Sequence, residues 1–136
     1  MSNIKQYEIS EWSDNKAVFV VDHDKATDDF FHLINNFFSD AESRLVDEDG
    51  NVVIAVLKMI ANECFVTQVA SPMNNYGIMA HFGTDNNGRS VEGFPPLDGS
   101  LGVLLTSVDC PEFTIDKEVK VVQLEAMPPK PEIPSF

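Results

Sequence analysis

Cysteines, long apolar runs and common catalytic motifs are scarce in this sequence, and each scarcity excludes a class of protein. The chain has two cysteines, Cys64 and Cys110, which lie too far apart to form a short metal-binding or redox motif. No apolar run reaches the length of about 18 residues that spans a membrane, and no apolar segment opens the chain. We therefore expect no transmembrane helix, no signal peptide, reduced thiols and a cytoplasmic location.

Motifs that hold cofactors are missing as well. The sequence contains no phosphate-binding glycine loop, no zinc-ligand spacing and no nucleophile elbow. It therefore predicts no catalytic residue, no metal and no cofactor.

Basic residues are also few, because nine Lys and Arg stand against 22 Asp and Glu, for a formal net charge of -13. Residues 1–50 hold 12 of the acids and four of the bases. Such a charge repels nucleic-acid phosphates and anionic lipids and attracts basic proteins. We therefore expect a protein partner, with basic partners favoured, and neither a nucleic-acid nor a membrane partner.

Mean acidity is too dilute for this chain to imitate DNA. A folded chain of this size exposes about 7,000 Å², so its 13 net charges amount to about one per 540 Å². Duplex DNA carries about one charge per 107 Å² of its surface. Mimicry of DNA would therefore need the acids between Asp22 and Asp49 to gather on one face.

The first part of the chain predicts a β-hairpin and then a helix. Residues 4–9 alternate in polarity, residues 17–22 form a more apolar strand, and residues 13–16 supply a turn between them. The helix begins with Thr27 or Asp24 as its N-cap. Its apolar residues recur at helical spacing: Phe30, Phe31, Leu33, Ile34, Phe37 and Phe38.

The middle of the chain predicts a second main helix and a long loop. Residues 39–47 extend or restart the first helix, and the second runs over about 51–69 with Cys64 on its apolar face. Residues 76–82 form a short helical turn or a strand. Residues 83–100 are rich in Gly, Asn, Ser and Pro and form a loop of unusual length.

The last part predicts a strand at 101–108 and one or two more at 113–115 and 119–124, with residues 116–118 as a possible turn. These strands are expected to form a second hairpin. The expected fold is therefore α+β: an antiparallel sheet of about four strands in β-β-α-α-β-β order, with two main helices packed on one face. Residues 1–126 form a single acidic domain, and residues 127–136 form a proline-rich C-terminal tail.

Two stretches are candidates for a binding site. Within the long loop, Phe94, Pro95 and Pro96 form a stiff apolar segment. One interpretation is an aromatic anchor for a partner, and the other is an ordered loop that packs Phe94 and Leu97 onto the domain.

The second stretch is the acidic run of Asp47, Glu48 and Asp49. Aligned with a calcium-binding loop through the glycine that follows, the run leaves Leu45 and Val56 at two positions that require oxygen ligands. We therefore interpret it as an acidic connection between helices.

Asp22, His23 and Asp24 place an imidazole between two carboxylates at the end of a strand. Such a trio could hold a metal or set up a general base if His32 or His81 converged on it. If the segment remains extended, however, His23 points away from the two carboxylates. A solvated turn that leads into the helix is the simpler interpretation.

Several segments together resemble a known family. They are Val21-Asp22-His23-Asp24, Ile34 to Ser39, Ala41 to Leu45, Ala55 to Met59, Asn75-Tyr76-Gly77 and Glu92 to Ser100. Over about residues 3–110 the chain is similar to the small phage, prophage and proteobacterial proteins grouped as domain of unknown function 2528. The resemblance implies a bacterial host cell and an accessory role, with no activity or catalytic residue to carry over.

We therefore expect a non-enzymatic phage or mobile-element accessory protein that binds another protein, in its sharpest form an acidic inhibitor of a host nuclease or defence complex. The expected partner-binding residues are Phe94, Pro95, Pro96, Asp47, Glu48 and Asp49. One alternative is a self-associating structural protein that uses Phe31, Phe38 or Phe94. The other is a small metal-dependent or hydrolytic enzyme that uses Asp22, His23 and Asp24.

Overall fold

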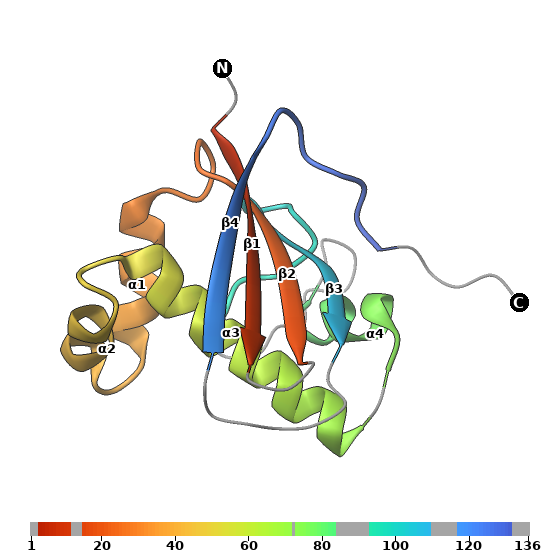
Figure 1. Cartoon of the computed structure of the whole chain (residues 1–136), viewed down its shortest axis with the longest axis horizontal. Coiled ribbons are helices and arrows are strands. Elements are labelled where there is room, and N and C mark those ends of the chain that lie inside the picture. The colour runs from red at the N-terminus through yellow and green to blue at the C-terminus, as the bar shows by residue number, and fades with distance from the viewer. Residues whose placement is uncertain (1–2, 12–14, 72, 84–92, 110–116, 132–136) are drawn as a thin grey trace, which may run out of the picture.

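Four antiparallel strands form one sheet, in the order β3-β2-β1-β4 (Figure 1). The computed structural model describes residues 3–11, 15–71, 73–83, 93–109 and 117–131. The strands are β1 (Ile4–Glu11), β2 (Lys16–Asp22), β3 (Val103–Asp109) and β4 (Lys117–Leu124). Because β1 and β2 are central, the N-terminal hairpin forms the middle of the sheet and the two C-terminal strands form its edges.

Alternation along the strands assigns one face of the sheet to the core. Tyr7 and Ile9 of β1 are buried, as are their cross-strand neighbours Phe19 and Ala17 of β2. Residues directly opposite each other in an antiparallel pair project to the same face, so these side chains form a single apolar layer. A register shift between β2 and β3 follows Val18, and beyond it Phe19 pairs with Leu105.

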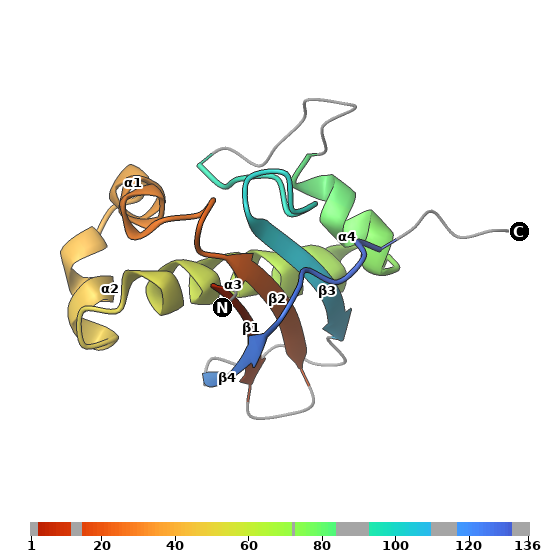
Figure 2. The same cartoon turned by 90° about the horizontal axis from the view of Figure 1, so that it is seen from above.

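The described part of the chain forms four helices. They lie on that side of the sheet (Figure 2). They are α1 (Asp28–Phe37), α2 (Ala41–Asp47), α3 (Val52–Ala70) and α4 (Asn75–His81). Among the described helices, α3 is long and apolar enough to cross a membrane, but half of its apolar window is buried inside the protein. Its buried residues, Cys64 among them, complete the core against the sheet.

Side-chain caps explain where three helices begin. Thr27 Oγ1 accepts a hydrogen bond from Phe30 N at the start of α1. Asn51 Oδ1 accepts one from Ile54 N at the start of α3, and Asn74 caps α4 in the same way. These caps satisfy amide groups that have no partner within the helix.

The connection between α1 and α2 is held by Arg44. Its guanidinium donates to Asn35 Oδ1 at 2.9 Å, to Asn35 O at 2.8 Å and to Phe38 O at 3.2 Å, and it also donates to Ser39 O. Asn35 is buried, and its amide group donates to Ala41 O at 3.1 Å. The fork of Arg44 therefore ties the end of α1 to the first turn of α2.

These two helices form one unit at one end of the molecule, on the left of both Figure 1 and Figure 2. We call residues 28–49 the acidic lobe. The lobe contains seven Asp and Glu and one Arg, so it holds -6 of the net charge of -13. The acidity of this segment is thus confined to one part of the fold.

The other face of the sheet carries no helix among the described residues (Figure 1). Residues 125–131 leave β4 without forming a helix or strand and run past the upper end of the sheet toward β3. The predicted tail begins within this segment, and residues 132–136 lie outside the described residues.

The predicted α+β class and single antiparallel sheet are confirmed, with helices in the middle of the chain. Residues 39–47 restart as the separate helix α2, and residues 76–81 belong to α4 rather than to a strand. The second hairpin is wrong, because β3 pairs with β2 while β4 pairs with β1. The free edges of the N-terminal hairpin each take one C-terminal strand. The predicted strand at 113–115 lies outside the described residues.

Candidate functional site

Two hollows flank the acidic lobe. The first, the apolar groove, has a volume of about 400 Å³. It is lined by Phe38, Arg44, Asp47, Glu48, Ala55, Lys58, Met59, Asn62, Glu63 and Phe94. The second, the polar cleft, has a volume of about 550 Å³. It is lined by Asn3, Lys5, Tyr7, His23, Thr27, Asp28, His32, Asp49, Gly50, Asn51, Val52 and Val53.

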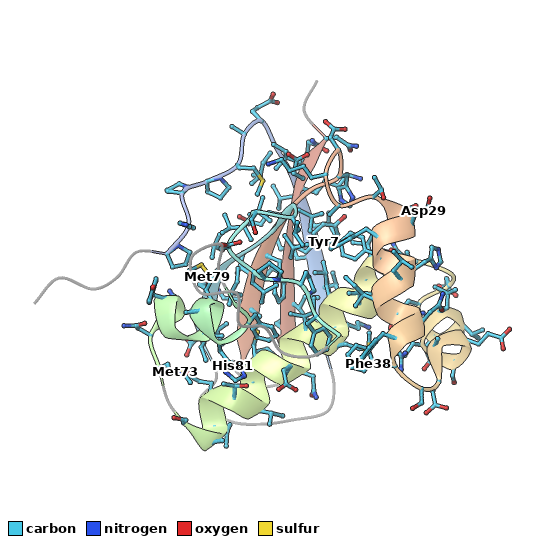
Figure 3. The ribbon with its side chains drawn as sticks, turned by 180° about the vertical axis from the view of Figure 1, so that it is seen from behind. Tyr7, Asp29, Phe38, Met73, Met79 and His81 are labelled. Carbon is cyan, nitrogen blue, oxygen red and sulfur yellow. The ribbon has the colours of Figure 1, made fainter. Side chains whose placement is uncertain are left out.

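Aromatic rings and a methionine form the apolar part of the groove. The ring centroids of Phe38 and Phe94 are 4.8 Å apart, and Phe94 also meets Phe82 edge to face at 6.0 Å. Met59 of α3 packs against the core beside them. Figure 3 shows Phe38 at the end of α1 next to α3, on the helix side of the molecule. Phe94 is half-buried, so one part of its ring supports the loop and another part remains accessible.

Charged side chains surround this apolar floor. Lys58 Nζ donates to both carboxylate oxygens of Glu48, at 3.0 and 2.8 Å, and so joins α3 to the end of α2. Arg44 is occupied by the carbonyl groups of the α1–α2 connection. Asp47 and Glu63 add two carboxylates to the lining. The rim thus carries three acids and two bases, and both bases are already engaged.

The structure brings together three of the six residues predicted to bind a partner. Phe94, Asp47 and Glu48 line the apolar groove although they come from distant parts of the sequence. Asp49 instead lines the polar cleft. Pro95 is buried, and Pro96 is half-buried outside the lining of both hollows.

Gly93 explains how the loop reaches the groove. Its φ is +89°, and an added Cβ would lie 2.4 Å from Phe37 Cδ1 and 2.5 Å from Phe38 Cζ. Only glycine adopts this backbone conformation readily and lets the loop approach the end of α1 so closely. The packing interpretation of the loop is therefore correct for Leu97, which is fully buried, and for part of Phe94.

A tyrosine–histidine pair occupies the polar cleft. A hydrogen bond of 2.8 Å joins Tyr7 Oη and His23 Nε2. Burial, and then the negative charge of Asp28, raise the pKa of Tyr7 to about 12. Burial, and then the charge of Lys5, lower the pKa of His23, although neighbouring carboxylates oppose this shift. At neutral pH a protonated phenol therefore faces a neutral imidazole.

No sequence motif predicts this pair, because Tyr7 and His23 lie on different elements and meet only in the folded chain. The trio predicted from the sequence lies at the same place: Asp22 is the last residue of β2, and His23 and Asp24 lie in the turn that follows. Asp22 Oδ1 accepts a hydrogen bond from Asp24 N at 3.0 Å. Thr27, not Asp24, is the N-cap of α1.

His32 also lines the cleft, whereas His81 lies on α4 (Figure 3). Among the described residues, no group of three His, Cys, Asp or Glu is placed to hold a metal. Cys64 is fully buried, and burial raises the pKa of its thiol, while Cys110 lies outside the described residues.

The acidic lobe also exposes apolar side chains. Leu33 and Phe37 of α1 are 73% and 56% exposed, and Val46 of α2 is 72% exposed. The apolar stripe of α1 is thus wider than the face that packs on α3. Phe31 is fully buried, so it is unavailable for the self-association interface predicted for it.

Comparison with known proteins places this architecture in a family. The chain is 42% identical over 110 residues to the protein ea10 of Escherichia phage lambda. The lambda prophage-derived protein ea10 of Escherichia coli O6:H1, strain CFT073, shows the same identity over the same length. Each alignment covers 80% of this chain and 88% of the relative. No solved structure matches the chain significantly. The family model described as protein of unknown function (DUF2528) matches residues 17–121, and the chain therefore belongs to this family.

Proposed function

We propose that this protein is a non-enzymatic accessory protein of phages and prophages, which acts in the host cytoplasm by binding another protein at the apolar groove. The observation that carries the proposal is the groove itself. It combines an aromatic and methionine floor with carboxylates at the rim, and both of its bases are engaged within the protein. Aromatic residues and methionine are enriched in the centres of protein interfaces.

The chemistry of the groove indicates what the partner should present. A volume of about 400 Å³ is enough for one or two large apolar side chains. Asp47 and Glu63 then favour lysine or arginine beside that anchor. Leu33, Phe37 and Val46 add apolar surface on the same lobe, which supports a contact wider than the groove.

The sharper form of the proposal is an inhibitor of a nuclease or a defence complex. Its support is the concentration of charge, because the 22 residues of the acidic lobe hold -6 of the chain's -13. A cleft that binds nucleic acid is basic, so an acidic lobe with an apolar anchor complements such a surface. We propose this as a charge match to a basic protein rather than as imitation of duplex geometry.

The test is an affinity capture from host lysate that compares matched variants. Asp47→Lys and Glu63→Lys reverse charge at the groove, while Asp109→Lys reverses an exposed acid on β3. We expect a protein that the unmodified chain and Asp109→Lys retain and that both groove variants lose. Retention should weaken in high salt because the rim contacts are ionic. Equal capture by all four chains would refute the proposal.

A direct measurement then removes the ambiguity of a lysate. The captured protein, once purified, is titrated against the chain and against Met59→Ala, which shortens the floor of the groove while leaving every charge in place. We expect weaker binding by about tenfold, the usual effect of truncating a central apolar contact. Unchanged affinity for Met59→Ala would show that the partner binds elsewhere.

A further inference from the structure

Exposed apolar surface is concentrated on the acidic lobe. Of the large apolar side chains in the described part of the chain, the three most exposed are Leu33 at 73%, Val46 at 72% and Phe37 at 56%. All three belong to residues 28–49, the segment that also holds -6 of the net charge of -13. Single exposed apolar residues are ordinary, but a contiguous group of them marks a contact surface. The lobe therefore has the features that recognise a partner surface both apolar and basic.

Helical spacing joins two of these residues into a stripe along α1. Leu33 and Phe37 are four residues apart, so they lie one above the other on the same face of the helix. Phe30, which is half-buried, lies three residues before Leu33 and extends this face by a further turn. Asp28 and His32 lie on another flank of the helix and line the polar cleft. We call Phe30, Leu33 and Phe37 the α1 stripe.

The α1 stripe leads into the apolar groove at the end of the helix. Phe37 and Phe38 meet edge to face, with ring centroids 5.1 Å apart, and Phe38 lies 4.8 Å from Phe94 in the groove. Gly93 closes the corner between them, because a Cβ on Gly93 would lie 2.4 Å from the ring of Phe37. One apolar track thus runs from the outer face of α1 into the groove.

A helix surface determines which kind of element can bind to it. The amide and carbonyl groups in the interior of α1 are bonded within the helix, so the stripe offers side chains and no main-chain partners. An extended segment would leave its own amide and carbonyl groups unpaired wherever the contact excludes water. A helix satisfies its own main chain and packs its side-chain ridges between those of α1. The element that fits the stripe is therefore an amphipathic helix.

Carboxylates border the stripe at both ends. Asp29 lies one turn before Leu33, Asp40 and Glu42 follow the last turn of α1, and all three acids are exposed (Figure 3 shows Asp29). The one Arg or Lys of the lobe, Arg44, is occupied by hydrogen bonds within the lobe. Lysine or arginine beside the apolar face of a partner helix would match this border. A second copy of this chain would instead bring another lobe with a net charge of -6.

We propose that the partner binds through a basic amphipathic helix, which lies along the α1 stripe and places an apolar side chain near its end in the apolar groove. The inference rests on the proposed function and names the element of the partner that the groove receives. Two turns cover the stripe and one or two more reach the groove, so the helix needs about 11–14 residues. Basic amphipathic helices in apolar grooves are an established mode of peptide recognition.

The probe is the capped peptide Lys-Leu-Lys-Ala-Leu-Leu-Lys-Lys-Leu-Ala-Lys-Leu-Lys, whose leucines share one face of a helix. It is titrated into the full chain by calorimetry. A scrambled peptide of the same composition, with its leucines spread around the helix, is the control for charge. A third peptide has proline in place of a central lysine, which breaks the helix. We expect the first peptide to become helical on binding, measured by circular dichroism, and to bind about tenfold more tightly than both controls.

Matched substitutions in the protein locate the binding. Leu33→Gln removes apolar surface at a well-exposed site and keeps a good helix former, so the fold should be unchanged. Val69→Gln makes the same change at a side chain that is 55% exposed, at the end of α3 far from the lobe (Figure 1). We expect Leu33→Gln to weaken binding of the amphipathic peptide by about five- to tenfold and Val69→Gln to leave it unchanged.

A second matched pair tests the charges. Asp29→Asn removes a carboxylate at the border of the stripe, and Asp109→Asn removes an exposed one on β3. We expect Asp29→Asn to weaken binding by about two- to fivefold, the range for exposed ion pairs, and Asp109→Asn to have no effect.

Three results would overturn the inference. Equal binding of the amphipathic and scrambled peptides would assign the attraction to charge alone. Equal losses for Leu33→Gln and Val69→Gln would show that the stripe is not the site. A concentration-dependent dimer of the chain alone, abolished by Leu33→Gln in sedimentation, would assign the stripe to a second copy.

The captured partner separates this inference from the proposed function. If both are correct, Met59→Ala and Leu33→Gln each weaken its binding. If Met59→Ala weakens binding and Leu33→Gln does not, the groove is the site and the helix along α1 is wrong. If Leu33→Gln weakens binding and Met59→Ala does not, the stripe binds the partner and the groove does not.

Discussion

Replacing Arg44 should separate the two helices of the acidic lobe. Its guanidinium makes four hydrogen bonds, one to the side chain of Asn35 and three to the carbonyl groups of Asn35, Phe38 and Ser39. Arg44→Ala removes all four donors at once. The Asn35 side chain is 1% exposed, so its Oδ1 would lose a partner that water cannot easily replace.

The expected loss follows from which acceptors can be solvated again. Leaving the buried Oδ1 of Asn35 without a donor costs about 1–3 kcal/mol. Ser39 is exposed and Phe38 is half-buried, so their carbonyl groups can bind water and should add about 1 kcal/mol together. Arg44→Ala should therefore lower the free energy of unfolding by about 2–4 kcal/mol. That is a large part of the roughly 5–15 kcal/mol of a typical domain.

The measurement is urea unfolding followed by circular dichroism. Arg44→Lys keeps the charge but loses the planar fork, so we expect it to recover less than half of the loss. Lys25→Ala removes an exposed base just before the lobe and should cost less than about 0.5 kcal/mol. A double-mutant cycle of Arg44→Ala with Asn35→Ala should give a coupling energy of about 1 kcal/mol or more.

Two outcomes would refute this reasoning. If Arg44→Ala lowered the free energy of unfolding by less than about 0.5 kcal/mol, the fork would contribute no more than a surface contact. If Arg44→Lys were as stable as the unmodified chain, charge alone would explain the role of Arg44. Hydrogen exchange should also locate the effect, with faster exchange in α1 and α2 than in α3.

Three further predictions concern single side chains. Gly93→Ala should lower the free energy of unfolding by about 2–4 kcal/mol, measured by thermal or urea unfolding, because the added Cβ meets two phenylalanine rings. Gly50→Ala is the control: Gly50 also has a positive φ but has open space around it, so the substitution should lower the free energy of unfolding by about 1 kcal/mol. Equal losses would refute the steric argument. Because the pKa of His23 is lowered in the folded protein, the unfolded chain binds the proton of His23 more readily. The contribution of His23 to the free energy of unfolding is therefore present above about pH 6.5 and is lost as the pH falls through the folded-state pKa. His23→Gln should make the free energy of unfolding less dependent on pH in this range, and an unchanged pH profile would contradict this prediction. In a Cys110→Ser variant, buried Cys64 should not react with a thiol reagent until the protein unfolds, and rapid labelling of the native protein would show that its burial is not maintained.

Local sequence patterns were sufficient to predict features that depend only on residues close together in the chain. The start of α1 was predicted to within two candidate caps, Thr27 and Asp24, because a cap depends on residues within one turn, and Thr27 is the cap in the structure. Apolar spacing likewise located α3 and placed Cys64 on its buried face. The class of fold followed from the order of these elements.

Long-range pairing could not be predicted in the same way. The segments that became β3 and β4 have similar apolar patterns, and nothing local shows that one joins β2 and the other β1. Leu33 and Phe37 fit the apolar spacing of α1 as well as Phe31 does, yet they are exposed because α3 covers only part of that helix.

The candidate site was predicted in part. The sequence showed that Asp47, Glu48 and Phe94 were unusual, and the fold brings them to one groove. It did not show Arg44 or Tyr7, whose partners become neighbours only in the folded chain. A lone arginine within an acidic segment was the one available signal for the first, and for the second there was none.

The pairing of β1 with β4 has a consequence for how the protein is made. Ile4 lies opposite Leu124, so the first strand of the sheet is completed by the last. Contacts so distant in sequence form slowly, and on the ribosome β1 must wait as an unprotected edge until β4 has been synthesised. A chain that stopped after β3 would retain α3 and most of the core, but β1 would lack its partner on one side. The centre of the sheet is therefore fully paired only after nearly the whole chain has been synthesised.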